Sequence, residues 1–209
     1  MMTWDKTNIM SSAIRMNSYW MMLLFIIICV ENVQAKKPIR TYLLMRDDRM
    51  DKNGFSRFSV LDSSGKEHLY RLKSSYTHDR LELISYPSKE VTACVEGQWK
   101  AEILNVSFQI FDSIRNETTN GTIQKVFNLF VETYTIEWNY ESFLLKKKLF
   151  TSYHKFYDWN GNLLGQFRKR FRWFSWSSFV YDLKIFIDKL AHEVYFFSVA
   201  IADHRNLMA

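Results

Sequence analysis

Short runs in which apolar and polar residues alternate follow one another along the chain from residue 57 onward, and turn-forming residues separate them. Alternation with a period of two predicts strands that are buried on one face. Two stretches repeat the same hairpin pattern, Val60-Leu-Asp-x-x-Gly65 and Phe156-Tyr-Asp-x-x-Gly161. In such a turn the aspartate side chain stabilises the start and the glycine adopts a positive φ at the end. We expect about ten to twelve strands in all.

The pattern changes near the C-terminus, where a strand-like run at residues 179–188 passes into an apolar block at residues 190–202 that carries one charge, Glu193. The block is about thirteen residues long, which is too short to cross a bilayer as a helix and suits a helix buried in protein. A helix that is apolar nearly all round needs protein on every side. The pattern therefore predicts a mainly β fold, in which a closed or nearly closed antiparallel sheet wraps around a hydrophobic C-terminal helix.

The first 35 residues have the features of a targeting segment. Lys6 and Arg15 precede an apolar run at residues 19–30, and Val33-x-Ala35 fits the small-residue rule for cleavage loosely. We interpret residues 1–35 as a signal peptide, which predicts a secreted or lumenal protein. An uncleaved anchor formed by residues 18–30 is the first alternative, and a mispredicted leader is the second. Met16 is a further candidate for the start of the chain.

Cysteine content changes with this cleavage. Removal of residues 1–35 takes Cys29 away and leaves Cys94 alone, so no internal disulfide can form. The residues around Cys94 predict a strand, and we expect a buried thiol; pairing between two chains is the alternative.

Three sequons mark Asn105, Asn116 and Asn120 as candidate N-glycosylation sites. The last two fall at residues 115–122, which we expect to be a loop tip that carries glycans without disturbing a sheet.

The formal net charge is +6, and residues 1–35 contribute two charges of each sign, so the excess belongs to the mature part. A basic surface favours an anionic partner. Charge alone does not choose among anionic lipid, sulfated glycan and nucleic acid, of which we expect lipid or glycan rather than nucleic acid.

A basic strand is the strongest candidate site. Alternation at residues 166–176 places Arg168, Arg170 and Arg172 on one face, with Phe167 and other aromatics on the opposite face. Successive arginines on such a face are about 7 Å apart, a spacing that suits phosphate or sulfate groups. With Lys169 they form the expected anionic-surface contact; a merely solubilising face above core aromatics is the alternative.

Three aromatic residues follow this strand, Trp173, Phe174 and Trp176. Amphipathic aromatic side chains are favoured at a membrane interface, so we identify these residues as membrane-interface candidates.

Enzymatic motifs are lacking. The five histidines show no metal-ligand spacing, and no HExxH or Gly-x-Ser-x-Gly motif is present. His154 and His192 stand beside aromatic residues and predict hydrogen-bonded core or rim histidines. We expect no enzymatic activity, no catalytic residue, no metal and no cofactor.

The chain repeats the order strand, Asp-x-x-Gly turn, strand, and it ends with a strand and a hydrophobic helix. This order of elements resembles that of the tubby C-terminal-like superfamily. Within it the chain is most similar to the LURP-one-related proteins and, more distantly, to the phospholipid scramblases. Residues 58–65, 156–169 and 181–203 carry the resemblance, which covers residues 57–206 after a lead-in at 36–56 with one strand at 41–45.

The resemblance implies a barrel of about twelve strands threaded by its last helix. It also implies lipid as a partner, because tubby-type domains bind phosphoinositide headgroups through surface lysines and arginines. The calcium-binding segment of the scramblases has no counterpart, since residues 175–182 offer one carboxylate.

These observations lead to a non-enzymatic binding module that contacts anionic membrane lipid or sulfated glycan. A scramblase-like lipid transporter is the first alternative, and it needs a membrane-embedded segment at residues 18–30 or 190–202, which are both short. The second alternative is a protein-interaction scaffold, with an unknown protein partner and no lipid ligand.

Overall fold

The structure, a computed structural model, describes residues 36–50, 56–74, 80–98, 104–113, 115–128, 130–170 and 179–208. The chain divides into two units, Met1–Lys37 and Pro38–Ala209. The predicted signal peptide at residues 1–35 lies outside the described residues. The strands and the helix that the structure describes belong to the second unit.

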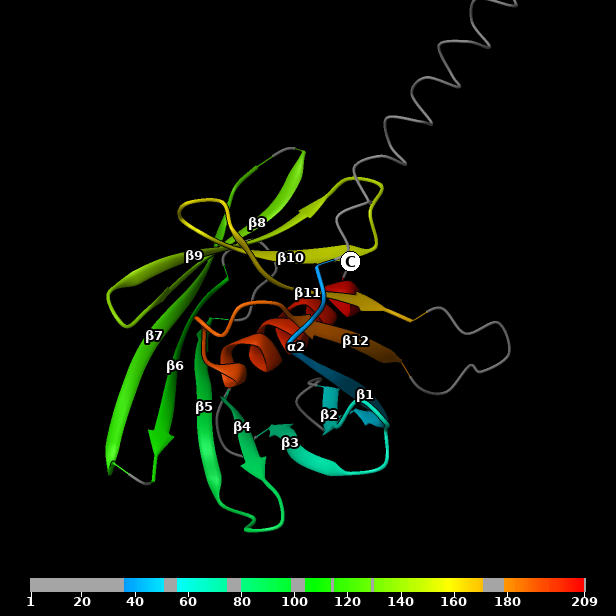
Figure 1. The fold of residues 1–209 in the computed structure, drawn as a ribbon, viewed down its shortest axis with the longest axis vertical. Helices are drawn as coiled ribbons and strands as arrows, with labels where there is room; N and C mark the ends of the chain where they lie inside the picture. Colours follow the sequence, from blue (N-terminus) through cyan, green and yellow to red (C-terminus); the bar gives the residue numbers. More distant parts are fainter. Residues whose placement is uncertain are drawn as a thin grey trace, which may run out of the picture. The chain divides into compact units, whose positions relative to one another are not determined.

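Twelve antiparallel strands form a closed barrel (Figure 1). Each strand pairs with its neighbours in sequence, and β1 pairs with β12 to close the sheet. The strands are β1 (Arg40–Met50), β2 (Ser56–Leu61), β3 (His68–Ser74), β4 (Arg80–Ser85), β5 (Val91–Gln98), β6 (Asn105–Asp112), β7 (Glu117–Val126), β8 (Val131–Trp138), β9 (Glu141–Lys148), β10 (Tyr153–Asp158), β11 (Leu163–Lys169) and β12 (Val180–Ile185). Closure removes the exposed edges that an open sheet leaves unpaired.

The two predicted Asp-x-x-Gly turns are confirmed. Asp62 accepts a hydrogen bond from the backbone N–H of Lys66 at 2.9 Å, and Asp158 accepts one from that of Asn162 at 2.8 Å. The glycines that end the two turns have φ angles of 73° and 82°. The Ser64 hydroxyl, together with backbone N–H groups, lowers the pKa of Asp62 to about 2, because these donors stabilise the charged carboxylate.

The C-terminal helix α2 (His192–Met208) lies within the barrel, as the apolar block predicts (Figure 1). Its residues 194–202 are all buried, and they pack with apolar side chains from the strands in one core. Strand β11 approaches the helix closely at Gly165, where a Cβ atom would lie 2.9 Å from the ring of Tyr195. Side chains of the helix therefore fill the space that the sheet encloses.

A buried ion pair joins the C-terminal half of α2 to the barrel wall. Arg46 of β1 donates to both carboxylate oxygens of Asp203, at 3.3 and 3.1 Å. The Tyr181 hydroxyl of β12 donates to the same carboxylate at 2.5 Å. Burial raises the pKa of Tyr181, and the negative charge of Asp203 raises it further, so this phenol remains protonated.

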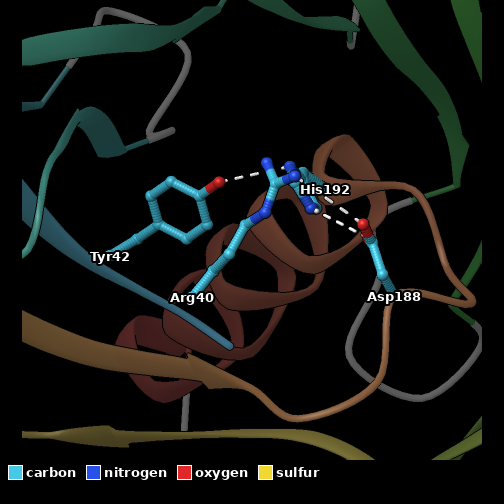
Figure 2. A network of polar contacts seen from close by, with 4 residues as sticks. All are labelled: Arg40, Tyr42, Asp188 and His192. Atoms are coloured by element: carbon cyan, nitrogen blue, oxygen red, sulfur yellow. Dashed lines mark hydrogen bonds and ion pairs between the residues drawn. The ribbon is translucent and has the colours of Figure 1, made fainter. Parts of the chain in front are cut away.

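A second polar network joins the start of α2 to β1 (Figure 2). The Tyr42 hydroxyl is 3.2 Å from Nδ1 of His192, and Nε2 of His192 is 3.2 Å from Asp188. Arg40 lies 3.7 Å from Asp188, and its hydrogen bond to Tyr42 raises the arginine pKa. His192 is thus the rim histidine that the sequence predicts, and β1 contacts both the first residue and the C-terminal half of the helix.

Two local expectations differ from the structure. The strand expected at residues 41–45 of the lead-in is confirmed as part of β1, but β1 pairs into the sheet, so the barrel begins at Arg40 and not at residue 57. The expected loop tip at residues 115–122 is wrong for most of its length, because β7 begins at Glu117 and Asn120 pairs with Gln109 of β6. Polar residues and a glycine favour a turn locally, but cross-strand pairing stabilises a strand here.

Candidate functional site

A row of lysines crosses the outer side of strands β9 to β12. Lys146 of β9 is the register partner of Lys155 of β10. Gln166 of β11 stands between Lys155 and Lys184 of β12 and pairs with both. Neighbouring strands are about 4.8 Å apart, so the first two lysines are adjacent and the third lies about 10 Å further along the row. The residues on either side of Lys155 and Lys184 in sequence point into the core or are buried, which directs these lysines outward.

Arg168 and Arg170 lie beside this row and share one carboxylate. Arg170 contacts Asp182 through two nitrogens, at 3.0 and 2.8 Å, and Arg168 lies 3.7 Å from the same residue. Arg168 also donates to the Tyr153 hydroxyl at 2.8 Å. The prediction that these two arginines occupy one face is confirmed, while Phe167 is buried on the other. Asp182 orders both guanidinium groups and balances one of their two charges.

We call this surface the basic face and define it by Lys146, Lys155, Arg168, Arg170 and Lys184. In the described part of the four strands, Asp182 is the carboxylate that contacts these guanidinium groups, while Glu141, an exposed carboxylate at the start of β9, pairs with Lys189. Among the described residues, none of the three lysines forms an ion pair. The face therefore combines ordered guanidinium groups with lysines whose charge is not balanced locally.

Lys169 does not belong to the basic face. Its Nζ lies 3.3 Å from the ring centroid of Phe179, on the opposite side of β11. Burial lowers the pKa of Lys169, although the negative charge of Asp203 opposes that shift. Strand alternation separates Lys169 from its arginine neighbours, and its cation–π contact belongs to the packing at the end of the barrel.

The other predicted site residues have mixed outcomes. Arg172, Trp173, Phe174 and Trp176 lie outside the described residues, so their role stays a prediction. All three sequon asparagines are exposed, one in the turn before β7 and two in strands; they are Asn105, Asn116 and Asn120.

Two further side chains lie where the sequence predicts them. Cys94 is buried, and burial raises the pKa of its thiol. His154 is buried as well and stacks on Phe167 with a centroid distance of 4.4 Å. Both residues thus contribute to packing.

The side chains of the basic face have the chemistry to contact anions. Guanidinium groups bind phosphate and sulfate oxygens in a fixed geometry, and lysines add point charges. Within the described ranges, no three His, Cys, Asp or Glu side chains are grouped so as to hold a metal ion. No helix of the described chain is both long enough and apolar enough to span a bilayer.

The lysine row is what sequence reasoning missed. Lys146, Lys155 and Lys184 come from three strands that are distant in sequence, and only the register brings them together. The run of three lysines at residues 146–148 is a partial signal, but taken alone it is typical of an ordinary solvated strand end.

Comparison with known proteins yields similarity at the level of structure. No protein-family model and no curated protein matches the chain. An X-ray structure of a protein from Arabidopsis thaliana is 12% identical and has a TM-score of 0.46; the similarity covers 78% of this chain and 89% of that one.

Proposed function

We propose that the protein is a non-enzymatic binding module of the tubby-like, LURP-one-related type, which contacts anionic membrane lipid or sulfated glycan through the basic face. The observation that carries the proposal is the register of Lys146, Lys155 and Lys184 beside Arg168 and Arg170. The closed barrel around a terminal helix supports the family, since this is the architecture that the sequence resemblance implies.

Electrostatics explains why such a face selects anions. Lys146 and Lys155 are closer together than the screening length of about 8 Å at physiological ionic strength, and Lys184 lies about 10 Å further along the row, so the potentials of the three lysines overlap. Each basic side chain near an anionic surface contributes about 1 kcal/mol to binding. We propose a secreted or lumenal location, which makes outer-leaflet or lumenal lipids and sulfated glycans the accessible ligands.

The two alternatives make different demands. A scramblase-like transporter needs a membrane-embedded segment, and one of its candidates, residues 190–202, contributes to the barrel core in this fold. A protein-interaction scaffold needs no cationic row. The row therefore favours the anion-binding module over both.

The experiment compares retention on immobilised heparin and flotation with phosphatidylserine-containing vesicles. The test variant is Lys146→Ser/Lys155→Ser/Lys184→Ser. We expect affinity for the polyanion to fall roughly a hundredfold, since three contributions of about 1 kcal/mol are lost. Arg168→Ser/Arg170→Ser/Arg172→Ser should also lose binding, but it leaves Asp182 without its guanidinium partners, so the lysine variant is the cleaner test.

The matched control is Lys66→Ser/Lys89→Ser/Arg115→Ser, which removes the same charge from three exposed turns outside the basic face. It should bind as the parent does. Equal affinity of the lysine variant and the parent would falsify the basic-face proposal. An equal loss of affinity in the lysine variant and the control would contradict it as well, because net charge alone would then explain the binding.

A further inference from the structure

Large apolar side chains are exposed on two neighbouring loops at one end of the barrel. Phe127 and Phe130 precede β8 and are 85% and 71% exposed, whereas Leu149 and Phe150 follow β9 and are 54% and 104% exposed. The loops are adjacent because β8 and β9 are paired, with Val131 opposite Lys148. We call Phe127, Phe130, Leu149 and Phe150 the apolar tip.

Phe150 occupies a backbone conformation that disfavours it. The backbone N–H of Thr151 donates to the Lys148 carbonyl at 3.3 Å, which places Phe150 third in a four-residue turn, with a φ of 64°. This position favours glycine, and a bulky residue with positive φ is a true outlier. A fully exposed phenylalanine adds no packing to the fold that would offset this strain. Phe150 therefore presents its ring to solvent without contributing to the core.

Side-chain hydrogen bonds join the described residues that precede and begin β8. The side chain of Asn128 accepts hydrogen bonds from the backbone N–H groups of Phe130 and Val131, at 3.0 and 3.2 Å. Between the two loops lies a hollow of about 560 Å³. The exposed apolar groups therefore project from a preformed structure.

Charge around the apolar tip identifies the occupant. Lys125, Lys147 and Lys148 line the hollow together with one carboxylate, Glu132. A second copy of the same surface would bring like charges together across a two-fold axis, which disfavours self-association. An anionic bilayer interface offers negative headgroups for the lysines and an apolar boundary for the aromatic rings.

We propose that the apolar tip docks into an anionic lipid bilayer, with Phe127, Phe130, Leu149 and Phe150 in the headgroup region. The proposal names the partner of the binding module, and to that extent it rests on the proposed function. The tip and the basic face are neighbours, because Leu149 and Phe150 lie in the loop that joins β9 to β10 and Lys146 of β9 is three residues before Leu149. Phospholipid headgroups can thus contact the lysines while the tip inserts.

The test attaches an environment-sensitive fluorophore, NBD, to the new thiol of Phe150→Cys or of Phe127→Cys in the full chain. A Cys29→Ser background leaves only buried Cys94, which does not react in the folded protein. The matched control site is Tyr140, which is 107% exposed, has a φ of 62°, and lies in the turn at the other end of β8 and β9. These strand ends are about 25 Å apart.

With vesicles of phosphatidylserine and phosphatidylcholine, we expect a blue shift and a several-fold rise in emission from labels at residues 150 and 127, and no change from residue 140. Phosphatidylcholine alone should give a weaker response, because the lysines then lack anionic headgroups. No emission change at residues 150 and 127 in vesicle-bound protein overturns the tip proposal, as does the same change at all three sites.

Heparin retention of the same labelled proteins separates the two proposals. Retention on heparin without any vesicle response supports the basic face as a glycan site and contradicts the proposal that the apolar tip docks into a bilayer. Absence of both responses overturns the proposed function and the tip together. A concentration-dependent dimer that is lost in Phe127→Ser/Phe150→Ser would also contradict bilayer docking, because it would assign the tip to a second copy.

Discussion

Glycines and exposed aromatic residues both occupy left-handed backbone conformations in this barrel, but only the glycines do so without strain. Gly65 and Gly161 have positive φ in turns that need it, and no strain results. Tyr140 and Phe150 have φ angles of 62° and 64° with fully exposed rings. An L-residue in this region costs roughly 1–2 kcal/mol relative to the right-handed conformation. The backbone conformations of these two aromatic residues therefore lower the free energy of unfolding.

Phe150→Gly should raise the free energy of unfolding by about 0.5–1 kcal/mol, since glycine relieves the left-handed strain and partly offsets this gain through its greater unfolded-state entropy. Urea denaturation measures the change. Tyr140→Gly should give a similar gain, while only Phe150→Gly should weaken association with anionic vesicles. A Phe150→Gly protein that is less stable than the parent would show that the ring contributes to the fold.

Strand β1 contacts the buried helix at two places. Near the start of α2, Tyr42 contacts His192, and further along the helix Arg46 pairs with Asp203. The side chains of Arg46 and Asp203 are 14% and 2% exposed, so this ion pair is shielded from solvent. Removing one member of a buried pair leaves an uncompensated charge, whereas replacing both by apolar residues is often neutral.

Asp203→Asn should lower the free energy of unfolding by about 3–4 kcal/mol, because Arg46 then remains buried without a charged partner. Arg46→Met/Tyr181→Phe/Asp203→Leu should recover most of that loss; Tyr181→Phe is included because the Tyr181 hydroxyl would otherwise lose its acceptor. Chemical denaturation of the two variants and the parent gives the comparison. A loss of less than about 1 kcal/mol in Asp203→Asn, or no recovery in the triple variant, would contradict a buried charge pair.

Across the barrel as a whole, local sequence patterns predict the strands, turns and helix, whereas pairing between distant strands determines which side chains lie together on the surface. The Asp-x-x-Gly turns and the apolar block at residues 190–202 are local signals, and the structure confirms them. The extent of β7 and the alignment of Lys155 with Lys184 depend on register, which arises from pairing with distant strands. The apolar tip also escapes prediction, since exposed and buried phenylalanines look alike in sequence.

Lysine reactivity is the sharpest test of the basic face, because it maps the contact without any substitution. Acetylation of the folded protein, read by mass spectrometry, is compared with and without heparin and with and without anionic vesicles. We expect several-fold protection of Lys146, Lys155 and Lys184 by at least one of these polyanions, and unchanged labelling of Lys66 and Lys89. Unchanged labelling of the three lysines with both polyanions, or protection confined to Lys66 and Lys89, would show that anions do not bind at this face.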